Sequence, residues 1–323
     1  MSKLRLVDLF SGIGGIRLGF EKAFKDTETL LSCEIDKNAA KTYEKNFKEN
    51  PLGDVTKIKT EEIPDFDVVL AGFPCQAFSV AGKRLGFEEA RGTMFFEVAR
   101  LIKDKKPKVV FLENVKGLLS HDKGQTFVVI QNILKDLGYE VYYKVLNSKD
   151  FGVPQKRERV YIIAFNKELV PNYKDFKFPK ASKKKVAIKD ILEENVELKH
   201  FVSRQYMKSL KAHKKRHADK GNGFGYEVIN PDSIANTIVV GGMGRERNLV
   251  KDLTKPTNKL EKDKVINKDK FRVMTVREWA RLQGFPDSYK FPVADGPAYK
   301  QLGNSVTVSV IKAIALEIKK VIA

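Results

Sequence analysis

The first half of the chain alternates strand-length apolar runs with segments of helical periodicity. Apolar runs predict strands over 4–10, 29–35, 67–72, 108–112, 139–146 and 159–165. Between these runs, apolar residues recur at helical spacing over 16–24, 93–103 and 127–137. Runs such as DVVLAG and KVVFL lack a polar face, which is typical of parallel strands covered by helices on both sides. The pattern predicts an α/β fold with a doubly wound, mostly parallel sheet.

This alternation stops near residue 167, where Lys-rich and Gly-rich sequence takes over. We expect a second, smaller and irregular domain over 186–275, followed by a hinge region over 276–286 that opens with a helix. The tail from Ser305 carries an apolar stripe at helical spacing, which indicates a helix packed on the first domain. The first domain would therefore consist of 1–185 completed by 287–323.

The charge of the chain changes this picture. Its 60 Lys and Arg against 41 Asp and Glu give a net charge of +19, which points to a polyanionic partner such as nucleic acid. A general bias toward lysine would give the same total. However, residues 199–220 hold eight Lys or Arg and only one acid, Asp219, which is denser than a solvated face requires.

Other classes of protein are disfavoured by composition. Two cysteines and four histidines argue against a disulfide scaffold and a thiolate or imidazole metal site, so no metal is expected. The apolar runs are far shorter than the roughly 20 residues that cross a bilayer. The N-terminus enters a strand pattern directly, without the features of a signal peptide. These observations favour a cytoplasmic protein without a membrane partner.

A glycine-rich turn, FSGIGG, follows the first predicted strand. Glycine permits positive φ and close approach of a ligand, and open α/β sheets bind nucleotide-like ligands at this position. Glu34 follows Gly12 by 22 residues, at the end of the second strand, where a carboxylate can hold ribose hydroxyls. Asp54 offers an acceptor for an adenine amino group. The turn alone also fits a dinucleotide dehydrogenase or a purely structural turn.

Four chemically versatile side chains lie at later strand ends. Cys75 follows the DVVLAG strand, Glu113 follows KVVFL, and Arg157 and Arg159 precede the last strand. Singly, these residues are compatible with an inert cysteine, a solvated carboxylate and phosphate-facing arginines. A structural cysteine, however, would not need the polar loop over 76–92 that follows it. Together at one sheet edge, a thiol, a carboxylate and a guanidinium form a candidate active site.

Seven motifs appear in order along the chain: DLFSGIGG, GDVTKI, GFPCQAFS, ENVKGL, QKRERVY, VREWARLQGFP and YKQLGNSV. Through them the sequence resembles the bacterial cytosine-5 DNA methyltransferases of type II restriction–modification systems over nearly its whole length. The resemblance implies methylation of C5 of a cytosine in double-stranded DNA, with S-adenosylmethionine as donor and S-adenosylhomocysteine as product. It implies a flipped target base and a monomeric enzyme, accompanied by a separately encoded cognate endonuclease.

The resemblance also assigns roles to residues. The Cys75 thiolate would add to C6 of the flipped cytosine, Glu113 would contact the N3/N4 edge and assist protonation at N3, and Arg159 would hold the O2 side. Arg157 is grouped with these catalytic residues, and the loop over 76–92 would close over the DNA. Cofactor contacts are expected from Phe10, Gly12, Ile13, Gly15, Glu34, Ile35, Asp54, Val55, Pro74 and Asn304. DNA contacts are expected from Lys83, Arg84, Arg91, Thr237, Arg245 and Arg247.

Ile35 stands where members of the family often place an aromatic residue against adenine, so that stacking contact is lost. The second domain would be the target-recognition domain, in which Arg245 and Arg247 either bind guanine in a bidentate manner or contact phosphate or only solvent. The Lys-rich flanks are expected to contact phosphates.

Three alternatives make different demands on the sequence. An RNA cytosine-5 methyltransferase of the usual kind employs two active-site cysteines, whereas this chain has Glu-Asn-Val at the second position. A NAD-dependent dehydrogenase explains the glycine turn but leaves Pro-Cys-Gln and the basic domain unexplained. An inactive DNA-binding module would not need Cys75 or Glu113, and both are present.

Overall fold

The computed structural model describes residues 3–74, 94–182, 185–254 and 266–322. Its main sheet has six strands in the order β2-β1-β3-β4-β6-β5. β6 runs antiparallel to both of its neighbours, β4 and β5, and the other pairs of adjacent strands are parallel. These strands are β1 (Leu4–Leu9), β2 (Thr27–Cys33), β3 (Val68–Ala71), β4 (Val109–Val115), β5 (Tyr139–Asn147) and β6 (Glu158–Asn166). The predicted α/β fold with a mostly parallel sheet is confirmed.

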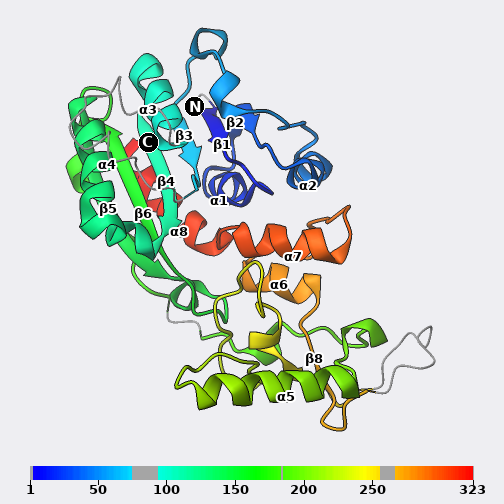
Figure 1. Cartoon of the computed structure of the whole chain (residues 1–323). Coiled ribbons are helices and arrows are strands. Elements are labelled where there is room, and N and C mark those ends of the chain that lie inside the picture. The colour runs from blue at the N-terminus through cyan, green and yellow to red at the C-terminus, as the bar shows by residue number, and fades with distance from the viewer. Residues whose placement is uncertain (1–2, 75–93, 183–184, 255–265, 323) are drawn as a thin grey trace.

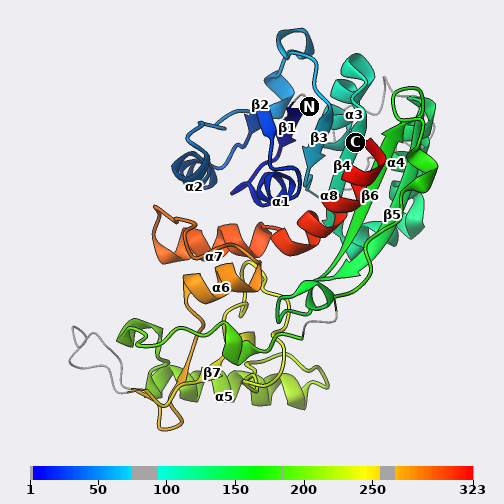
Figure 2. The same cartoon turned by 180° about the vertical axis from the view of Figure 1, so that it is seen from behind.

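Helices cover both faces of this sheet, which Figures 1 and 2 show from opposite sides. On one face, α3 (Met94–Lys105) and α4 (Gln125–Asp136) bury their apolar sides against the strands. On the other face lie α1 (Gly15–Phe24) and α8 (Val308–Ile322). A Cβ at Gly19 of α1 would lie 2.5 Å from Ile311, so these two helices approach very closely. The C-terminal helix therefore packs on the first domain, as its apolar stripe indicates.

The residues after 185 contain more regular structure than expected. A two-stranded sheet pairs β7 (Val250–Lys251) with β8 (Phe271–Arg272), and α5 (Arg204–Asp219) is a helix of 16 residues. Helical periodicity was not visible in α5 because only Met207 and Leu210 are buried. Its remaining side chains are exposed or, as at His213 and His217, half-buried. Ser203 caps its N-terminus by accepting a hydrogen bond from the Tyr206 N–H.

Two further helices, α6 (Val276–Leu282) and α7 (Asp295–Asn304), lie between the sheet and the small domain in Figure 1. The predicted helix over 275–282 is α6. Neither α7 nor α2 (Lys37–Phe47) is predicted by the sequence analysis. Both are short and amphipathic, and the apolar part of α2 consists mainly of Ala39, Ala40 and Tyr43.

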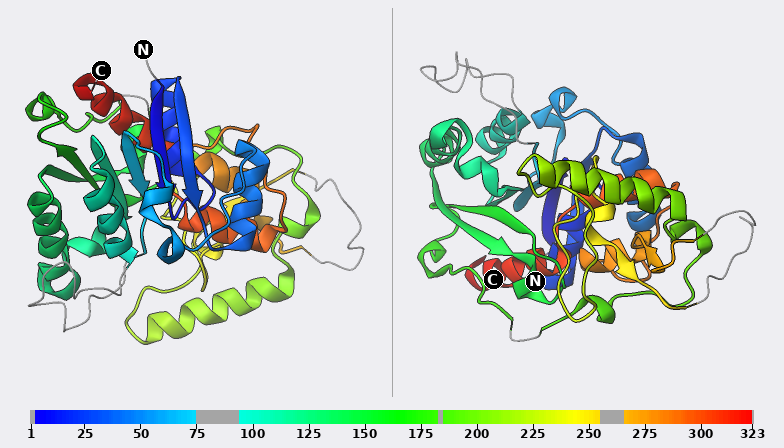
Figure 3. Two further views of the ribbon diagram at one scale, coloured as in Figure 1. Left: turned by 90° about the horizontal axis from the view of Figure 1, so that it is seen from above. Right: turned by 60° about the horizontal axis from the view of Figure 1, so that its bottom comes forward.

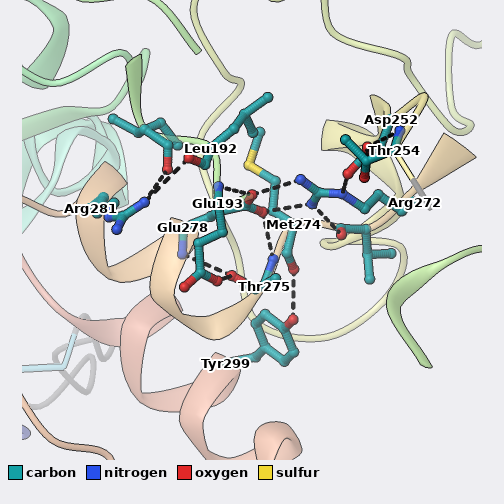
Figure 4. A network of polar contacts seen from close by, with 12 residues as sticks. Leu192, Glu193, Asp252, Thr254, Arg272, Met274, Thr275, Glu278, Arg281 and Tyr299 are labelled. Atoms are coloured by element: carbon teal, nitrogen blue, oxygen red, sulfur yellow. Dashed lines mark hydrogen bonds and ion pairs between the residues drawn. The ribbon is translucent and has the colours of Figure 1, made fainter. Parts of the chain in front are cut away.

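A buried ion network joins the small domain to α6 (Figure 4). The Arg272 guanidinium in β8 lies 2.6 Å from Asp252 and 2.8 Å from Glu278 in α6. Glu278 also accepts the Thr275 backbone N–H and completes a capping box. Arg272 is 1% exposed and Glu278 0%, so loss of either partner would leave an unpaired buried charge, at a cost of about 3–5 kcal/mol.

Candidate active site

A cavity of about 750 Å³ opens at the C-terminal edge of the parallel strands, a size typical of small-molecule sites. Its lining comes from the β1–α1 turn, the ends of β2, β3 and β4, the segment that enters β6, and α7. A second cavity of about 240 Å³ shares four lining residues with it: Phe10, Glu34, Ile35 and Pro74. The two cavities therefore adjoin along these four residues.

The glycine-rich turn forms one wall of the larger cavity. Phe10 and Gly12 have positive φ, at 52° and 55°, which turns the chain sharply after β1. A Cβ at Gly14 would lie 2.2 Å from the ring of Phe47 in α2, and one at Gly15 would lie 2.8 Å from Val306. Glycine is required here because the turn is packed tightly between two other segments.

Glu34 fixes the second wall, at the end of β2. Its Oε2 accepts the Gly12 N–H at 2.7 Å, and its Oε1 accepts the Asp36 N–H at 2.7 Å. Each carboxylate oxygen keeps a lone pair for a further donor such as a ribose hydroxyl.

The smaller cavity is lined by Ile35, Asp54, Val55 and Pro74. The side chain of Ile35 is 72% exposed, so it offers an uncovered aliphatic surface. The Asp54 carboxylate is exposed, and hydrogen bonds from Thr56 hold the pKa of Asp54 below its usual range. Asp54 is therefore an ionised acceptor at neutral pH.

The remaining predicted cofactor residues, Ile13, Gly15 and Asn304, line the larger cavity. Three residues that the sequence analysis missed also reach this cavity: Asp36, Lys300 and Gln301. Lys300 pairs with Asp36 at 2.9 Å, and the Gln301 Nε2 has no hydrogen-bond partner among the described residues. Lys300 and Gln301 belong to the YKQLGNSV motif, in which the sequence analysis assigns a cofactor contact only to Asn304.

Glu113 lies near the end of β4 and is 8% exposed. The Arg159 Nε is 3.2 Å from the Glu113 Oε1, which is an ion pair without hydrogen-bond alignment. Burial raises the pKa of Glu113, and the charges of Arg159 and Arg157 offset part of that shift. The carboxyl group therefore retains its proton to higher pH than an exposed glutamate does, and Oε1 has no aligned donor among the described residues.

Asn114 is a site residue to which the sequence analysis gave no role. Its Nδ2 donates to the Phe73 carbonyl at 2.9 Å, and Phe73 lies two residues before Cys75 in the chain. Cys75 itself, together with the predicted DNA contacts Lys83, Arg84 and Arg91, lies outside the described residues. Pro74, the last described residue before Cys75, lines both cavities.

Arg157 lines the larger cavity but is only 2% exposed. Its Nη1 donates to the Ile238 carbonyl at 3.0 Å, and its Nη2 donates to the carbonyls of Gly303 at 3.1 Å and Ser305 at 2.6 Å. The hydrogen bonds of this guanidinium therefore go to backbone carbonyls, whereas Arg159 faces Glu113.

The predicted recognition residues differ in their surroundings. The Thr237 hydroxyl donates to the Lys156 carbonyl of the first domain. Arg245 is exposed and lies over the ring of Tyr299 in α7, 5.3 Å from its centroid. The Arg247 guanidinium lies 3.9 Å from the Glu227 carboxylate. Arg245 is thus supported by an aromatic ring, while Arg247 faces a neutralising charge.

Among the described residues, no three His, Cys, Asp or Glu side chains gather as metal ligands would. None of the helices described is both long and apolar enough to cross a membrane.

A family model described as C-5 cytosine-specific DNA methylase matches residues 4–320. Type II methyltransferase M.HpaII of Haemophilus parainfluenzae is 52% identical, covering 98% of this chain and 89% of that protein. Type II methyltransferase M.HhaI of Haemophilus parahaemolyticus is 41% identical, covering 98% of this chain and 95% of that protein.

Solved structures share the fold at low sequence identity. The Entamoeba histolytica methyltransferase EhMeth superposes with a TM-score of 0.76 at 20% identity, covering 99% of both chains. The S. pombe Dnmt2 methyltransferase superposes with a TM-score of 0.75 at 21% identity, covering 98% of this chain and 99% of that one.

Proposed function

This chain belongs to the C-5 cytosine-specific DNA methylases, and from that premise we propose how its own residues carry out the reaction. The family resemblance of the sequence is confirmed, and the protein is a DNA (cytosine-5-)-methyltransferase that uses S-adenosylmethionine. The observation that carries the proposed residue roles is the buried Glu113–Arg159 pair at a cavity that the glycine-rich turn also lines.

In the proposed mechanism, the flipped cytosine enters the larger cavity with its N3/N4 edge toward Glu113 and its O2 side toward Arg159. The Cys75 thiolate adds to C6 while Glu113 protonates N3, and this gives C5 carbanion character. C5 would then take the methyl group that S-adenosylmethionine supplies, with S-adenosylhomocysteine as the leaving group. A base would remove the C5 proton as the Cys75–C6 bond breaks by β-elimination, and N3 would return its proton to Glu113. The raised pKa of Glu113 supports its role as the proton donor.

The residues around the turn fit the cofactor. When bound, S-adenosylmethionine supplies an activated methyl group on a sulfonium sulfur. Glu34 would accept from the ribose hydroxyls, Asp54 would accept from the adenine amino group, and Ile35 would pack on the adenine face. The tight turn, its positive φ values and the exposed acceptors all support this placement.

The Glu34 carboxylate gives a direct test of the cofactor site. Glu34→Ala should weaken binding of S-adenosylhomocysteine by roughly 10- to 100-fold, because it removes charge-assisted hydrogen bonds. Isothermal titration calorimetry measures this. Glu28→Ala is the matched control, since Glu28 is an exposed carboxylate in β2, the strand that leads to Glu34. Wild-type affinity in the Glu34 variant would remove this residue from the site.

Double-stranded DNA would bind between a catalytic domain, 1–185 with 287–323, and a recognition domain over 186–275, joined by the hinge over 276–286. Lys83, Arg84 and Arg91 would contact DNA from the loop after Cys75. Arg245 is the better candidate to read a guanine, because its guanidinium is exposed and supported by Tyr299.

Basic residues of α5 are proposed to contact phosphates. Charge reversal at Lys214 and Lys215 should weaken binding to all DNA sequences alike and reduce the salt slope by about 2. Titrations of duplexes at several salt concentrations measure both effects.

The control reverses Lys312 and Lys320 on α8, which lies on the opposite side of the molecule from α5 (Figure 3). Lys214 also donates to the Tyr226 carbonyl, so Lys215→Glu should be measured alone as well. A loss confined to one DNA sequence would contradict phosphate contact.

The biological setting is proposed from the relatives. They are named type II methyltransferases, which supports a methylase of a restriction–modification system. We further propose that the chain acts as a monomer beside a separately encoded endonuclease, in the cytoplasm where its DNA lies. The same relatives disfavour an RNA substrate. Bisulfite sequencing of DNA from a host that expresses the chain tests the reaction and gives the site. Unconverted cytosines should appear at one short sequence, and their absence would contradict the proposal.

A further inference from the structure

The segment that enters β6 lies alongside the recognition domain. The Ala235 N–H donates to the Pro154 carbonyl at 2.7 Å, and the Lys156 N–H donates to the Ala235 carbonyl at 2.9 Å. Two side chains extend this pairing to Ile238. Its N–H donates to the Gln155 Oε1 at 3.1 Å, and its carbonyl accepts from Arg157 at 3.0 Å. Both backbone polar groups of Ile238 are therefore held by the catalytic domain.

The same guanidinium reaches the end of α7. It binds the carbonyls of Gly303 and Ser305, the two residues that flank Asn304 in the cofactor cavity. The part of the recognition domain over 235–240, the recognition segment, also contacts this turn directly. A Cβ at Gly303 would lie 2.7 Å from the Val240 side chain and 3.1 Å from its backbone nitrogen. One side chain thus joins the recognition segment to the turn that carries a predicted cofactor contact.

Arginine suits this position because its planar guanidinium presents several N–H groups in fixed directions. A lysine ammonium keeps the charge but cannot reproduce that fork. We propose that Arg157 is a positioning residue that couples DNA recognition to cofactor binding, by fixing the Asn304 turn relative to the recognition segment. This inference rests on the proposed function, and it assigns Arg157 no contact with the reacting base.

The Asn304 turn has a second support, which makes the proposal testable. The Gln283 Nε2 donates to the carbonyls of Leu302 at 2.9 Å and Ser305 at 3.2 Å. The cofactor site should therefore persist when Arg157 is replaced, and only its response to DNA should change.

The experiment measures the Kd of S-adenosylhomocysteine with and without a duplex that carries the methylation site found by bisulfite sequencing. In wild type, the duplex should tighten binding by about 5- to 150-fold, the usual range of coupling between sites. In Arg157→Lys, affinity without DNA should stay within about threefold of wild type, while the tightening falls below about twofold.

The control is Arg272→Lys, which alters an arginine as deeply buried but bound to Asp252 and Glu278. It should keep the tightening by DNA. The proposal is overturned if wild type shows no tightening, if Arg157→Lys retains it, or if Arg272→Lys loses it equally. A wild-type protein that neither methylates DNA nor binds S-adenosylhomocysteine would instead contradict the proposed function.

A measurement on wild type alone tests the coupling even if Arg157→Lys does not fold. Amide hydrogen exchange over 302–306 should slow when the duplex is added without cofactor, because recognition would fix the Asn304 turn. Unchanged exchange there, in a protein that binds the duplex, overturns the coupling.

Discussion

Replacing Cys75 with alanine is expected to reduce methyl transfer at least about a thousandfold while leaving DNA binding near its wild-type strength. Without the thiolate, no bond forms to C6, and C5 of cytosine does not become nucleophilic. Transfer of a radiolabelled methyl group measures the first effect, and a gel-shift titration measures the second. Retained turnover would refute the covalent mechanism.

Cys33 provides the matched control for this variant. It ends β2, is 4% exposed, and burial raises the pKa of its thiol to about 11. Cys33 is therefore a neutral thiol at physiological pH and a poor nucleophile. Cys33→Ala should keep methyl transfer within a few fold of wild type.

A trapping experiment identifies the attacking sulfur. With S-adenosylmethionine present, a duplex carrying 5-fluorocytosine at the methylation site should remain covalently attached to wild type and to Cys33→Ala. The fluorine cannot leave as a proton does, so elimination stops. Cys75→Ala should yield no adduct, and an adduct in that variant would assign the nucleophile elsewhere.

The second large effect is expected from Glu113→Gln, which keeps the side chain's shape but removes the titrating proton. The turnover number should fall by about 100- to 1,000-fold, within the usual contribution of a general acid. Affinity for S-adenosylhomocysteine should change little, because Glu34 and Asp54 provide the predicted polar contacts to the nucleoside. Glu158→Gln is the control, since Glu158 at the start of β6 is a half-exposed carboxylate paired with Lys116, the residue that follows β4.

The pH profile distinguishes a proton donor from a structural carboxylate. Because burial raises the pKa of Glu113, its protonated form persists to higher pH than in an exposed glutamate. The wild-type rate should decline as the pH rises through that pKa, where the donor loses its proton. Glu113→Gln should lack this decline while keeping the rise that accompanies formation of the Cys75 thiolate. An identical decline in the variant would place the titrating group elsewhere.

Much of the site could be predicted from the sequence because it lies at strand ends. Apolar runs fix the parallel strands, and residues that follow such strands meet at one edge of the sheet. Glu34 and Glu113 were placed there by this rule, and the structure brings both to the same cavity. The family motifs then supplied the predicted role of each residue. Neither step required a contact between distant parts of the chain.

Other features, a helix and a set of long-range contacts, became visible only in the tertiary structure. The helix α5 escaped prediction because few of its residues are buried, so solvated side chains hid its periodicity. Arg157 received a catalytic role from its motif, yet its guanidinium binds carbonyls 81 to 148 residues away. Every residue carries the same carbonyl group, so the sequence holds no sign of which one a buried arginine will meet. Local chemistry therefore determined the strands and the candidate reacting groups, while only the folded chain determined which segments those groups hold together.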